Sequence, residues 1–460
     1  MLSEKTDQAP NSTATLPAAL RTPVPRYTSY PTAPHFHEGI GQEQTQRWLA
    51  HLPSAEGVSV YAHIPYCDRL CWFCGCHTKQ TKRYDPVAVY VGVLCREIAL
   101  VEQAIGFAPI LSQLHLGGGS PSMLNERDLE RLRAAFETAF RFSSDAQVSM
   151  ELDPSDKSPE EFAALARFGV TRASIGVQDF NERVQAAINR PQTYAQTAGA
   201  VDTLRRFGVS SINIDALYGL PYQTAKSLEE TLNQVISLAP DRIALFGYAH
   251  VPWMKKHQNM IPEDALPDEE ERLEQAKLAS GMLVASGYVS IGIDHFARPD
   301  DSLTRAAKEG RLRRNFQGYT DDDCRTLLGL GASSIGRFEE GYVQNHVPTA
   351  QYMRSVTEGR LPTARGIALS ASDRLHSDVI EQLMCNFRFS VTALRARHGQ
   401  IADRIAQQVA EISSGDRSTL CKFDGDEFSV RDPARAYTRT VASWFDARLN
   451  TGAARYSAAV

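Results

Sequence analysis

From residue 58 onward the sequence alternates short β-rich runs with helical stretches, and this alternation limits the fold more than any other feature. The six β-rich runs lie at 58–64, 111–116, 147–152, 172–177, 211–217 and 242–246. Helical stretches with recognisable ends separate them; one begins at Ser158-Pro159-Glu160-Glu161, an N-cap followed by proline and a capping-box glutamate, and stops near Gly169. Such alternation is typical of a parallel sheet with crossover helices. We therefore expect an α/β fold built on an incomplete (β/α)6 TIM-like barrel.

The pattern changes on both sides of the barrel, which predicts additional units. We expect an N-terminal arm or lid over 1–50, the partial barrel over 51–310, an extension that completes the site over 311–364, and a C-terminal domain over 365–460. Residues 288–296 are expected to add one further strand. The C-terminal stretch contains helical patterns followed by a β-hairpin signal at 419–430, centred on Asp424-Gly425-Asp426. These features predict a small, mostly helical, winged-helix-like domain.

Composition and charge exclude several classes of protein. The chain has 460 residues, 43% of them hydrophobic, and a net charge of −5, so neither nucleic acid nor an anionic membrane is an expected partner. No run approaches the roughly 18 apolar residues that span a bilayer. The first 25 residues include Glu4 and Asp7 and lack a continuous apolar stretch. We expect a cytoplasmic protein.

Half of the eight cysteines lie close together, at Cys67, Cys71, Cys74 and Cys76. In a reducing compartment such a group indicates a metal or cluster site. The spacing Cys67-x3-Cys71-x2-Cys74 allows one loop to place three thiolates on three irons of a cubane and leaves one iron open. Structural zinc, or a cluster with Cys76 as its fourth ligand, fits the spacing equally well. Cys76 could also be a neighbouring thiol that binds no metal, so the spacing alone does not decide.

Residues with useful chemistry follow or end each predicted strand. Gly117-Gly118-Gly119-Ser120 follows the second strand, where glycines allow backbone groups to approach a ligand closely. It lacks the Gly-Lys-Ser/Thr of a phosphate-binding loop. Functional sites in parallel α/β sheets form at the carboxyl ends of the strands. The candidates at the other strands are the four cysteines, Glu151, Gln178, Asp215 and Tyr248-Ala249-His250.

The cysteine motif Cys67-x3-Cys71-Trp72-Phe73-Cys74, with the glycine run, resembles that of radical S-adenosylmethionine (SAM) enzymes. The wider set of motifs is similar to that of the oxygen-independent coproporphyrinogen III oxidase (dehydrogenase) family, over nearly the whole chain. Four motifs carry this resemblance: 26–32 (Arg-Tyr-Thr-Ser-Tyr-Pro-Thr), 61–66 (Tyr-Ala-His-Ile-Pro-Tyr), 176–180 (Gly-Val-Gln-Asp-Phe) and 315–320 (Asn-Phe-Gln-Gly-Tyr-Thr).

The resemblance implies a [4Fe–4S] cluster held by Cys67, Cys71 and Cys74, with SAM on the fourth iron. It also implies two SAM molecules, side by side. The residues that match the first SAM site are Tyr61, Gly118, Glu151 and Ile335. The residues that match the second are Phe73, Gly119, Ser120, Gln178, Arg190, Asp215 and Ala249.

The activity implied by the resemblance is oxidative decarboxylation of two propionates of coproporphyrinogen III to vinyl groups, giving protoporphyrinogen IX for haem biosynthesis. A 5′-deoxyadenosyl radical formed from SAM would remove the hydrogen. The expected partners are the porphyrinogen, an unidentified electron donor protein and an unidentified electron acceptor, and we expect a monomer. The alternatives are a haem chaperone or a haem-handling radical SAM relative without oxidase activity, and a zinc-bearing βα scaffold.

Two further expectations concern the substrate. Of Arg26, Lys308, Arg313 and Arg314, which could bind substrate carboxylates, we favour Arg26 alone. The segment from Arg21 to His37 is expected to close over the site as a lid.

Overall fold

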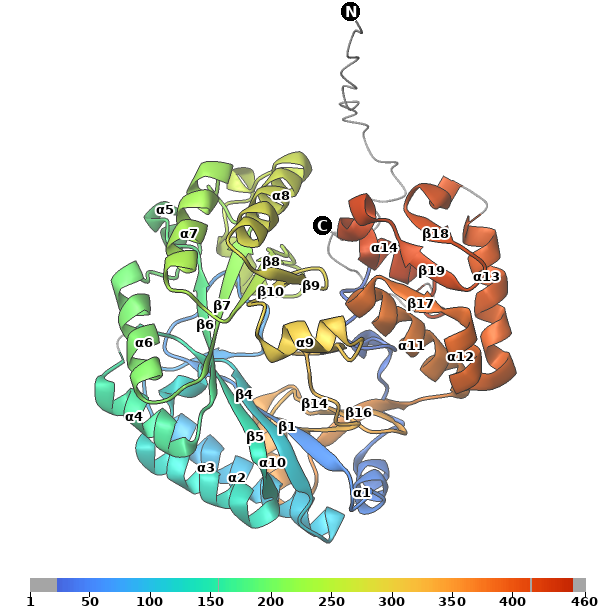
Figure 1. Cartoon of the computed structure of the whole chain (residues 1–460). Coiled ribbons are helices and arrows are strands. Elements are labelled where there is room, and N and C mark those ends of the chain that lie inside the picture. The colour runs from blue at the N-terminus through green and yellow to red at the C-terminus, as the bar shows by residue number, and fades with distance from the viewer. Residues whose placement is uncertain (1–22, 156, 414–415, 450–460) are drawn as a thin grey trace, which may run out of the picture.

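The computed structural model describes residues 23–155, 157–413 and 416–449. Its centre is a twelve-stranded sheet in the order β16-β15-β14-β13-β1-β4-β5-β6-β7-β8-β10-β9, which curls without closing (Figure 1). The six central strands run parallel, as predicted. They are β1 (Gly57–Ile64), β4 (Ile110–Gly118), β5 (Arg141–Leu152), β6 (Arg172–Gln178), β7 (Ser211–Tyr218) and β8 (Arg242–Gly247).

Amphipathic helices cover the outer face of the curved sheet (Figure 1). They bury Leu, Ile, Val and Phe side chains in one continuous core between helices and strands, and this burial is the main force that stabilises the barrel. The expected helix after Ser158 is present, with a complete capping box and Gly169 in the left-handed conformation at its end. The helices of the barrel are α2 (Asp85–Ile105), α3 (Glu126–Ala139), α4 (Pro159–Phe168), α5 (Glu182–Ala187), α6 (Tyr194–Arg206), α7 (Ala225–Ser237) and α8 (Glu269–Ala285).

The barrel stays open because different strands border each end of the parallel series. On one side β13 (Thr326–Leu330) pairs parallel to β1, and three antiparallel strands continue outward from β13. On the other side β10 pairs antiparallel to β8. The remaining elements of this region are β14 (Ile335–Arg337), β15 (Gly341–Asn345), β16 (Thr363–Ala368), α9 (Ser302–Lys308), α10 (Thr349–Thr357), β11 (Arg313–Asn315) and β12 (Gly318–Thr320).

The prediction of a single strand over 288–296 is wrong in detail. The segment forms two short antiparallel strands, β9 (Val289–Ile291) and β10 (His295–Ala297). The turn between them contains Gly292 with a φ of +56°, and a Cβ there would lie 2.0 Å from the ring of Tyr319. Both constraints require glycine, so the chain reverses instead of continuing as one strand.

The C-terminal part is a separate core of helices around a three-stranded sheet (Figure 1). The hairpin expected at 419–430 is present as β18 and β19. The elements are α11 (Ala371–Asn386), β17 (Arg388–Ser390), α12 (Val391–His398), α13 (Asp403–Ser413), β18 (Cys421–Phe423), β19 (Glu427–Val430) and α14 (Thr438–Ser443).

The described part of the N-terminal arm is packed against both halves of the molecule. Tyr27 and Tyr30 are buried in the C-terminal core, and the Tyr27 hydroxyl donates to Asp446 at 3.0 Å. Farther along, α1 (Gln42–Ala50) places Trp48 against Phe338 of the extension. The arm therefore joins the N-terminal residues to the C-terminal domain and to the edge of the sheet.

One buried carboxylate connects α2 to the extension. Glu97 is 1% exposed and accepts hydrogen bonds from the Gly331 amide, the Asn345 side chain and the Tyr352 hydroxyl, each at 2.7 Å. Burial raises the pKa of Glu97 to about 7. These three donors come from the loop after β13, from β15 and from α10, so Glu97 fixes the extension against the barrel.

We expect Glu97→Ala to lower the free energy of unfolding by about 3 kcal/mol or more, because three buried donors lose their acceptor and a cavity opens. The shift of the urea unfolding midpoint measures this. Gln103→Ala, an exposed position on the same helix, is the control and should change stability by less than about 0.5 kcal/mol. Equal midpoints for the two variants would contradict the connecting role of Glu97.

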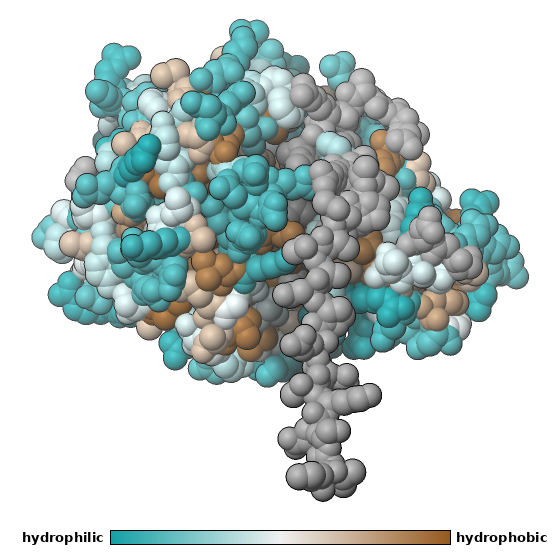
Figure 2. All heavy atoms as spheres, turned by 90° about the horizontal axis from the view of Figure 1, so that it is seen from above, coloured by the Kyte–Doolittle hydropathy of each residue, from teal (hydrophilic) through white to brown (hydrophobic). Residues whose placement is uncertain are grey.

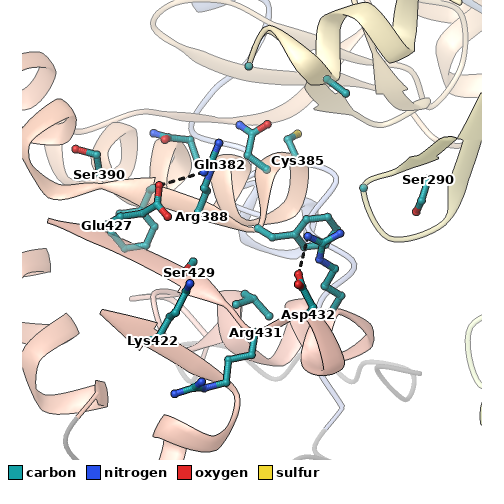
Figure 3. A pocket seen from close by; sticks show the side chains of 18 of the residues that line it. Ser290, Gln382, Cys385, Arg388, Ser390, Lys422, Glu427, Ser429, Arg431 and Asp432 are labelled. Carbon is teal, nitrogen blue, oxygen red and sulfur yellow. Dashed lines mark hydrogen bonds and ion pairs between the residues drawn. The ribbon is translucent and has the colours of Figure 1, made fainter. Parts of the chain in front are cut away.

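The surface contains small apolar areas separated by hydrophilic side chains on the face shown in Figure 2. None of the described helices is long and apolar enough to span a bilayer. A groove of about 1010 Å³ lies between the C-terminal domain and the region of β9 and α9 (Figure 3). In the groove Arg388 pairs with Glu427 at 3.3 Å and Arg435 with Asp432 at 2.8 Å. None of the residues predicted to hold the cluster or SAM lines it, and of the four candidates for substrate carboxylates only Lys308 does, so the groove offers positions for control substitutions.

Candidate active site

The carboxyl ends of the parallel strands bring together most of the predicted site residues. Tyr61 lies in β1 and Gly118 at the end of β4, with Glu151 in the neighbouring β5. Glu151 accepts a hydrogen bond from the Gly118 amide at 2.9 Å and lies 3.3 Å from the imidazole of His115. The ring of Tyr61 stacks on His115 with 5.7 Å between centroids. These contacts fix Glu151 at the edge where a ligand could reach it.

The electrostatics of Glu151 favour its charged form. Burial acts to raise its pKa, but the hydrogen bond and charge of His115 and the Gly118 amide bond together hold the pKa of Glu151 below its ordinary value. A carboxylate at this position can accept from an ammonium group or a hydroxyl group.

The cysteine loop leaves the end of β1 and returns beside it through β2 (Tyr66–Cys67) and β3 (Lys79–Gln80). The segment that follows β8 contacts the other side of the cysteine loop. Three side chains there bond to loop carbonyls: Lys255 to Cys76 at 3.0 Å, His257 to Cys74 at 2.7 Å, and Gln258 to Phe73 at 3.0 Å. The conformation of the loop is therefore set by residues some 180 positions away.

Each of the three motif thiols has a different polar neighbour. The Sγ of Cys67 lies 3.1 Å from the Thr78 hydroxyl, and the Sγ of Cys71 accepts from Arg190 at 3.4 Å. Burial raises the pKa of Cys67 to about 12 and also raises the pKa of Cys71. Hydrogen bonds from Cys76 lower the pKa of Cys74 to about 7. Cys76 itself is exposed.

The arrangement of these sulfur atoms helps to decide whether the loop suits a structural zinc ion or a multi-iron cluster. A tetrahedral zinc with Zn–S bonds of about 2.3 Å requires its thiolates about 3.8 Å apart. Among the described residues, no three of the four loop thiols lie mutually within 4.8 Å. A cluster in which each thiolate binds a different iron does not require three thiolates in such close contact. The residues present therefore fit an iron–sulfur cluster better than zinc.

The glycine run after β4 allows the cysteine loop to pass close to the sheet. A Cβ on Gly119 would lie 2.4 Å from the carbonyl oxygen of Tyr66, and one on Gly118 would lie 2.5 Å from the ring of His63. Gly118 also has a φ of +113°. Both contacts are too short for any side chain, so these glycines are required by the packing between β4 and the start of the loop.

Arg190 links the cysteine loop to the strands. Its guanidinium group donates to the Gly176 carbonyl at 2.5 and 3.1 Å, to Asp153 at 3.3 Å and to the Sγ of Cys71 at 3.4 Å. Gln178, at the end of β6, has a φ of +67° and is buried. A strained, buried residue at a strand end is a common feature of functional sites.

Asp215 belongs to the same group of predicted site residues and lies within β7, before the end of that strand. It accepts from Asn213 at 2.7 Å and from Ser174 at 3.2 Å. Burial, followed by the charge of Glu151, raises the pKa of Asp215 to about 6. Glu151 pairs with Ser174 and Asp215 with Gly176, two residues along β6, so the β5 and β7 carboxylates lie on the same face of the sheet.

The remaining predicted residues are placed differently. Phe73 packs against an apolar cluster that includes Ile188 and Tyr248, and Ser120 is buried with its hydroxyl 3.1 Å from Ser122. The carbonyl of Ala249 accepts from Gln258. Ile335 begins β14 of the antiparallel extension and packs in an apolar group with Phe36 and Tyr342; its backbone adjoins Gly329, which pairs with Tyr61 of β1.

Sequence reasoning missed several residues that hold the site together. His115 and Asp153 bond to Glu151 and Arg190, and both could have been found from their positions within or just after a predicted strand. Lys255, His257 and Gln258 had no such signal, because they lie in an irregular segment with one short 3-10 helix (Lys256–Met260).

Comparisons with known proteins agree with this geometry. Residues 61–235 match the family model for the radical SAM superfamily. An oxygen-independent coproporphyrinogen III oxidase of Cereibacter sphaeroides is 46% identical over 436 residues, covering 95% of this chain and 96% of the relative. One from Bradyrhizobium diazoefficiens is 45% identical over 437 residues, covering 95% and 97%. The solved structure of the Escherichia coli coproporphyrinogen III oxidase, described as a radical SAM enzyme, has a TM-score of 0.88 at 37% identity and covers 92% of this chain and 98% of that one.

Proposed function

Because the chain belongs to the oxygen-independent coproporphyrinogen III oxidase family of the radical SAM superfamily, we propose that it converts coproporphyrinogen III to protoporphyrinogen IX. Two propionate side chains become vinyl groups. Each conversion removes one hydrogen atom from the propionate β-carbon, releases carbon dioxide and passes one electron to an acceptor. The reaction belongs to anaerobic haem biosynthesis.

The family implies a [4Fe–4S] cluster and SAM, and three thiols of the chain suit the cluster. Cys67, Cys71 and Cys74 would each hold one iron. When bound, the cluster and SAM supply the one-electron chemistry that removes the substrate hydrogen. The protein residues hold these groups, orient them and exclude water.

We further propose two SAM molecules, divided among the strand-end residues. Tyr61, Gly118, Glu151 and Ile335 would contact the first. The proximity of Glu151 to the Gly118 amide supports this, because the pair offers a carboxylate beside a glycine edge that suits an ammonium group. The residues proposed to contact the second are Phe73, Gly119, Ser120, Gln178, Arg190, Asp215 and Ala249.

The observation that carries the proposed function is the arrangement of Cys71, Arg190 and Asp153 at the strand ends next to the glycine edge. A guanidinium group that donates to the thiol proposed to hold an iron, and that is itself held by a carboxylate, orients that thiol relative to the strand ends. The contact from Arg190 to the Cys71 thiol adds nothing that a plain βα scaffold requires, whereas the contacts to Gly176 and Asp153 also stabilise the fold.

The test is anaerobic reconstitution with iron and sulfide, reduction with SAM and coproporphyrinogen III, and chromatography for 5′-deoxyadenosine and the divinyl product. We expect both products, and neither from Cys71→Ala. Deoxyadenosine without porphyrin conversion would indicate a radical SAM enzyme that acts on a different substrate. Neither product from a protein that holds its cluster, together with tight haem retention, would favour a haem-binding chaperone.

The pH dependence of SAM binding tests the proposed role of Asp215. Its pKa of about 6 is raised by burial and by Glu151, and is opposed by bonds from Asn213 and Ser174 and by His295. Only the carboxylate, present above pH 6, accepts hydrogen bonds at both oxygens. We expect SAM to bind about fourfold more weakly at pH 5.5 than at pH 7.5, from the fraction ionised. The same ratio in Asp215→Asn, measured by equilibrium binding, would contradict this.

We propose a monomer, in the cytoplasm and without nucleic acid or membrane, that takes electrons from a donor protein for the cleavage of SAM and passes the electrons lost by the substrate to a separate acceptor. We also propose that the N-terminal arm closes the site. Deleting the arm would remove Tyr27 and Tyr30 from the C-terminal core, so single substitutions in the arm are the better probe.

A further inference from the structure

Guanidinium groups from four distant segments meet beside the ends of β7 and β8. Asp294, just before β10, locates this group beside β8, because its backbone carbonyl accepts a hydrogen bond from the Leu245 amide of β8 at 2.8 Å. The four arginines and their contacts are Arg26 to the Gly247 carbonyl at 3.1 Å, Arg272 to the Tyr248 carbonyl at 2.9 Å, Arg439 to Asp294 at 3.0 Å, and Arg314 at 3.8 Å from Asp294.

Three of these cations lack a carboxylate at hydrogen-bonding distance in the part of the chain that the structure describes. Arg26 and Arg272 donate to backbone carbonyls, and Arg314 lies over the ring of Tyr319 at 4.4 Å. Arg314 is 8% exposed, and its Nε and one terminal nitrogen have no hydrogen-bond partner. Asp294 lies 3.8 Å from Arg314 and pairs with Arg439, but one carboxylate does not balance four cations, so a bound anion would stabilise the group.

Arg439 and Arg314 are close enough to Arg26 to repel its charge. Burial, followed by the charge of Arg439, lowers the pKa of Arg26 to about 10, and Arg314 acts in the same direction. Glycines make room for Arg272: a Cβ on Gly219 would lie 2.9 Å from its guanidinium group. Such close packing of like charges is expected at a built anion site and not on a solvated surface.

The arginine group borders the proposed reaction site. His295 bonds to Asp294 at 2.8 Å, and the ring of Phe246 lies against it. In the sheet, His295 and Asp215 pair with the same residue of β8, Ala244. An anion bound by the arginines would therefore lie next to the strand ends that are proposed to hold SAM.

We propose that Arg26, Arg272 and Arg314, with Arg439 held by Asp294, bind propionate carboxylates of the porphyrinogen. This assignment rests on the proposed function and names its substrate-binding residues. A planar guanidinium group matches a carboxylate with two parallel hydrogen bonds. The arm, the barrel, the segment at β11 and the C-terminal domain each contribute one cation, so a substrate with several propionates would join all four parts.

The structure also separates these residues from other cations of the same segments. Lys308 lines the groove between the C-terminal domain and the region of β9 and α9 (the outer groove), and Arg313 pairs with Glu381 at 3.0 Å. Of the four residues that the sequence offered for substrate carboxylates, only Arg26 and Arg314 lie in the group.

Equilibrium binding of coproporphyrin III tests the proposal without turnover. This fluorescent porphyrin has four carboxylates, and its tetramethyl ester has none. We expect the reconstituted protein to bind the acid at least tenfold more tightly than the ester. Arg26→Gln and Arg272→Gln should each weaken binding of the acid by about tenfold and leave binding of the ester unchanged.

Arg388→Gln is the matched control, because Arg388 lies in the outer groove and pairs with Glu427 (Figure 3). It should bind both porphyrins as the unmodified protein does. The iron–sulfur absorbance of each variant shows that it is folded, and Arg272→Lys should recover part of the affinity for the acid. Equal affinity for acid and ester, or a preference that survives in both glutamine variants, overturns the assignment. Loss of the divinyl product alone would count against the proposed function and not against the binding site.

Discussion

Replacing Gly119 with alanine should lower formation of the divinyl product by about 100-fold or more. The added methyl group would lie 2.4 Å from the carbonyl oxygen of Tyr66 and 2.8 Å from its carbonyl carbon and amide nitrogen. Backbone atoms cannot rotate away as a side chain can, so β4 and the start of the cysteine loop must separate. A displacement of about 1 Å in a catalytic arrangement is enough for a loss of this size. Product formation per reconstituted cluster is the measurement.

The control for this prediction is the same chemical change in open space. Gly199 lies within α6, and a Cβ there would meet nothing within 4 Å. Gly199→Ala should leave activity unchanged and raise stability by up to about 1 kcal/mol, because alanine favours the helix. If Gly119→Ala retained activity like Gly199→Ala, the glycine edge would not be set by its contact with the loop.

The parallel core of the fold could be predicted from sequence because its signals are local. The six β-rich runs are confirmed as strands, most of them within two residues at each end. β5 begins six residues earlier than expected, at Arg141, because its first half is polar and partly exposed, without the apolar run that marks the buried half. The strand-end position of Glu151 and Asp215 followed from the same parallel arrangement.

The non-local features could not be read from the sequence. β13 pairs with β1 across some 270 residues, in a register that joins Val58 to Thr326, and no local sequence pattern predicts this pairing. The placement of Tyr27 in the C-terminal core and the meeting of Arg26 with Arg439 are of the same kind. Each depends on which surfaces meet after the barrel and the C-terminal domain have formed. A motif can therefore identify the cluster loop, whereas the arginine group requires the three-dimensional structure.

Arg190→Ala should both destabilise the protein and remove its activity. The substitution leaves Asp153 without its cationic partner in a site where the Arg190 side chain is only 11% exposed, and it frees the Gly176 carbonyl and the thiol of Cys71. Removing one member of such a pair lowers the free energy of unfolding by about 3 kcal/mol. Because Arg190 acts as a positioning residue on Cys71, product formation should fall by about 100-fold even in protein that retains its cluster.

Two variants separate these effects. Arg183→Ala, in α5 near Arg190, removes an exposed guanidinium group that lies over the ring of Tyr222 at 4.1 Å. It should change stability by less than about 1 kcal/mol and leave turnover intact. Arg190→Lys keeps the charge beside Asp153 but has a single ammonium group, which cannot reach Gly176, Asp153 and Cys71 together. It should restore most of the thermal stability and little of the turnover. If Arg190→Lys instead recovered full activity, charge alone would suffice, and the geometric link from the strands to the cysteine loop would not be needed for the reaction.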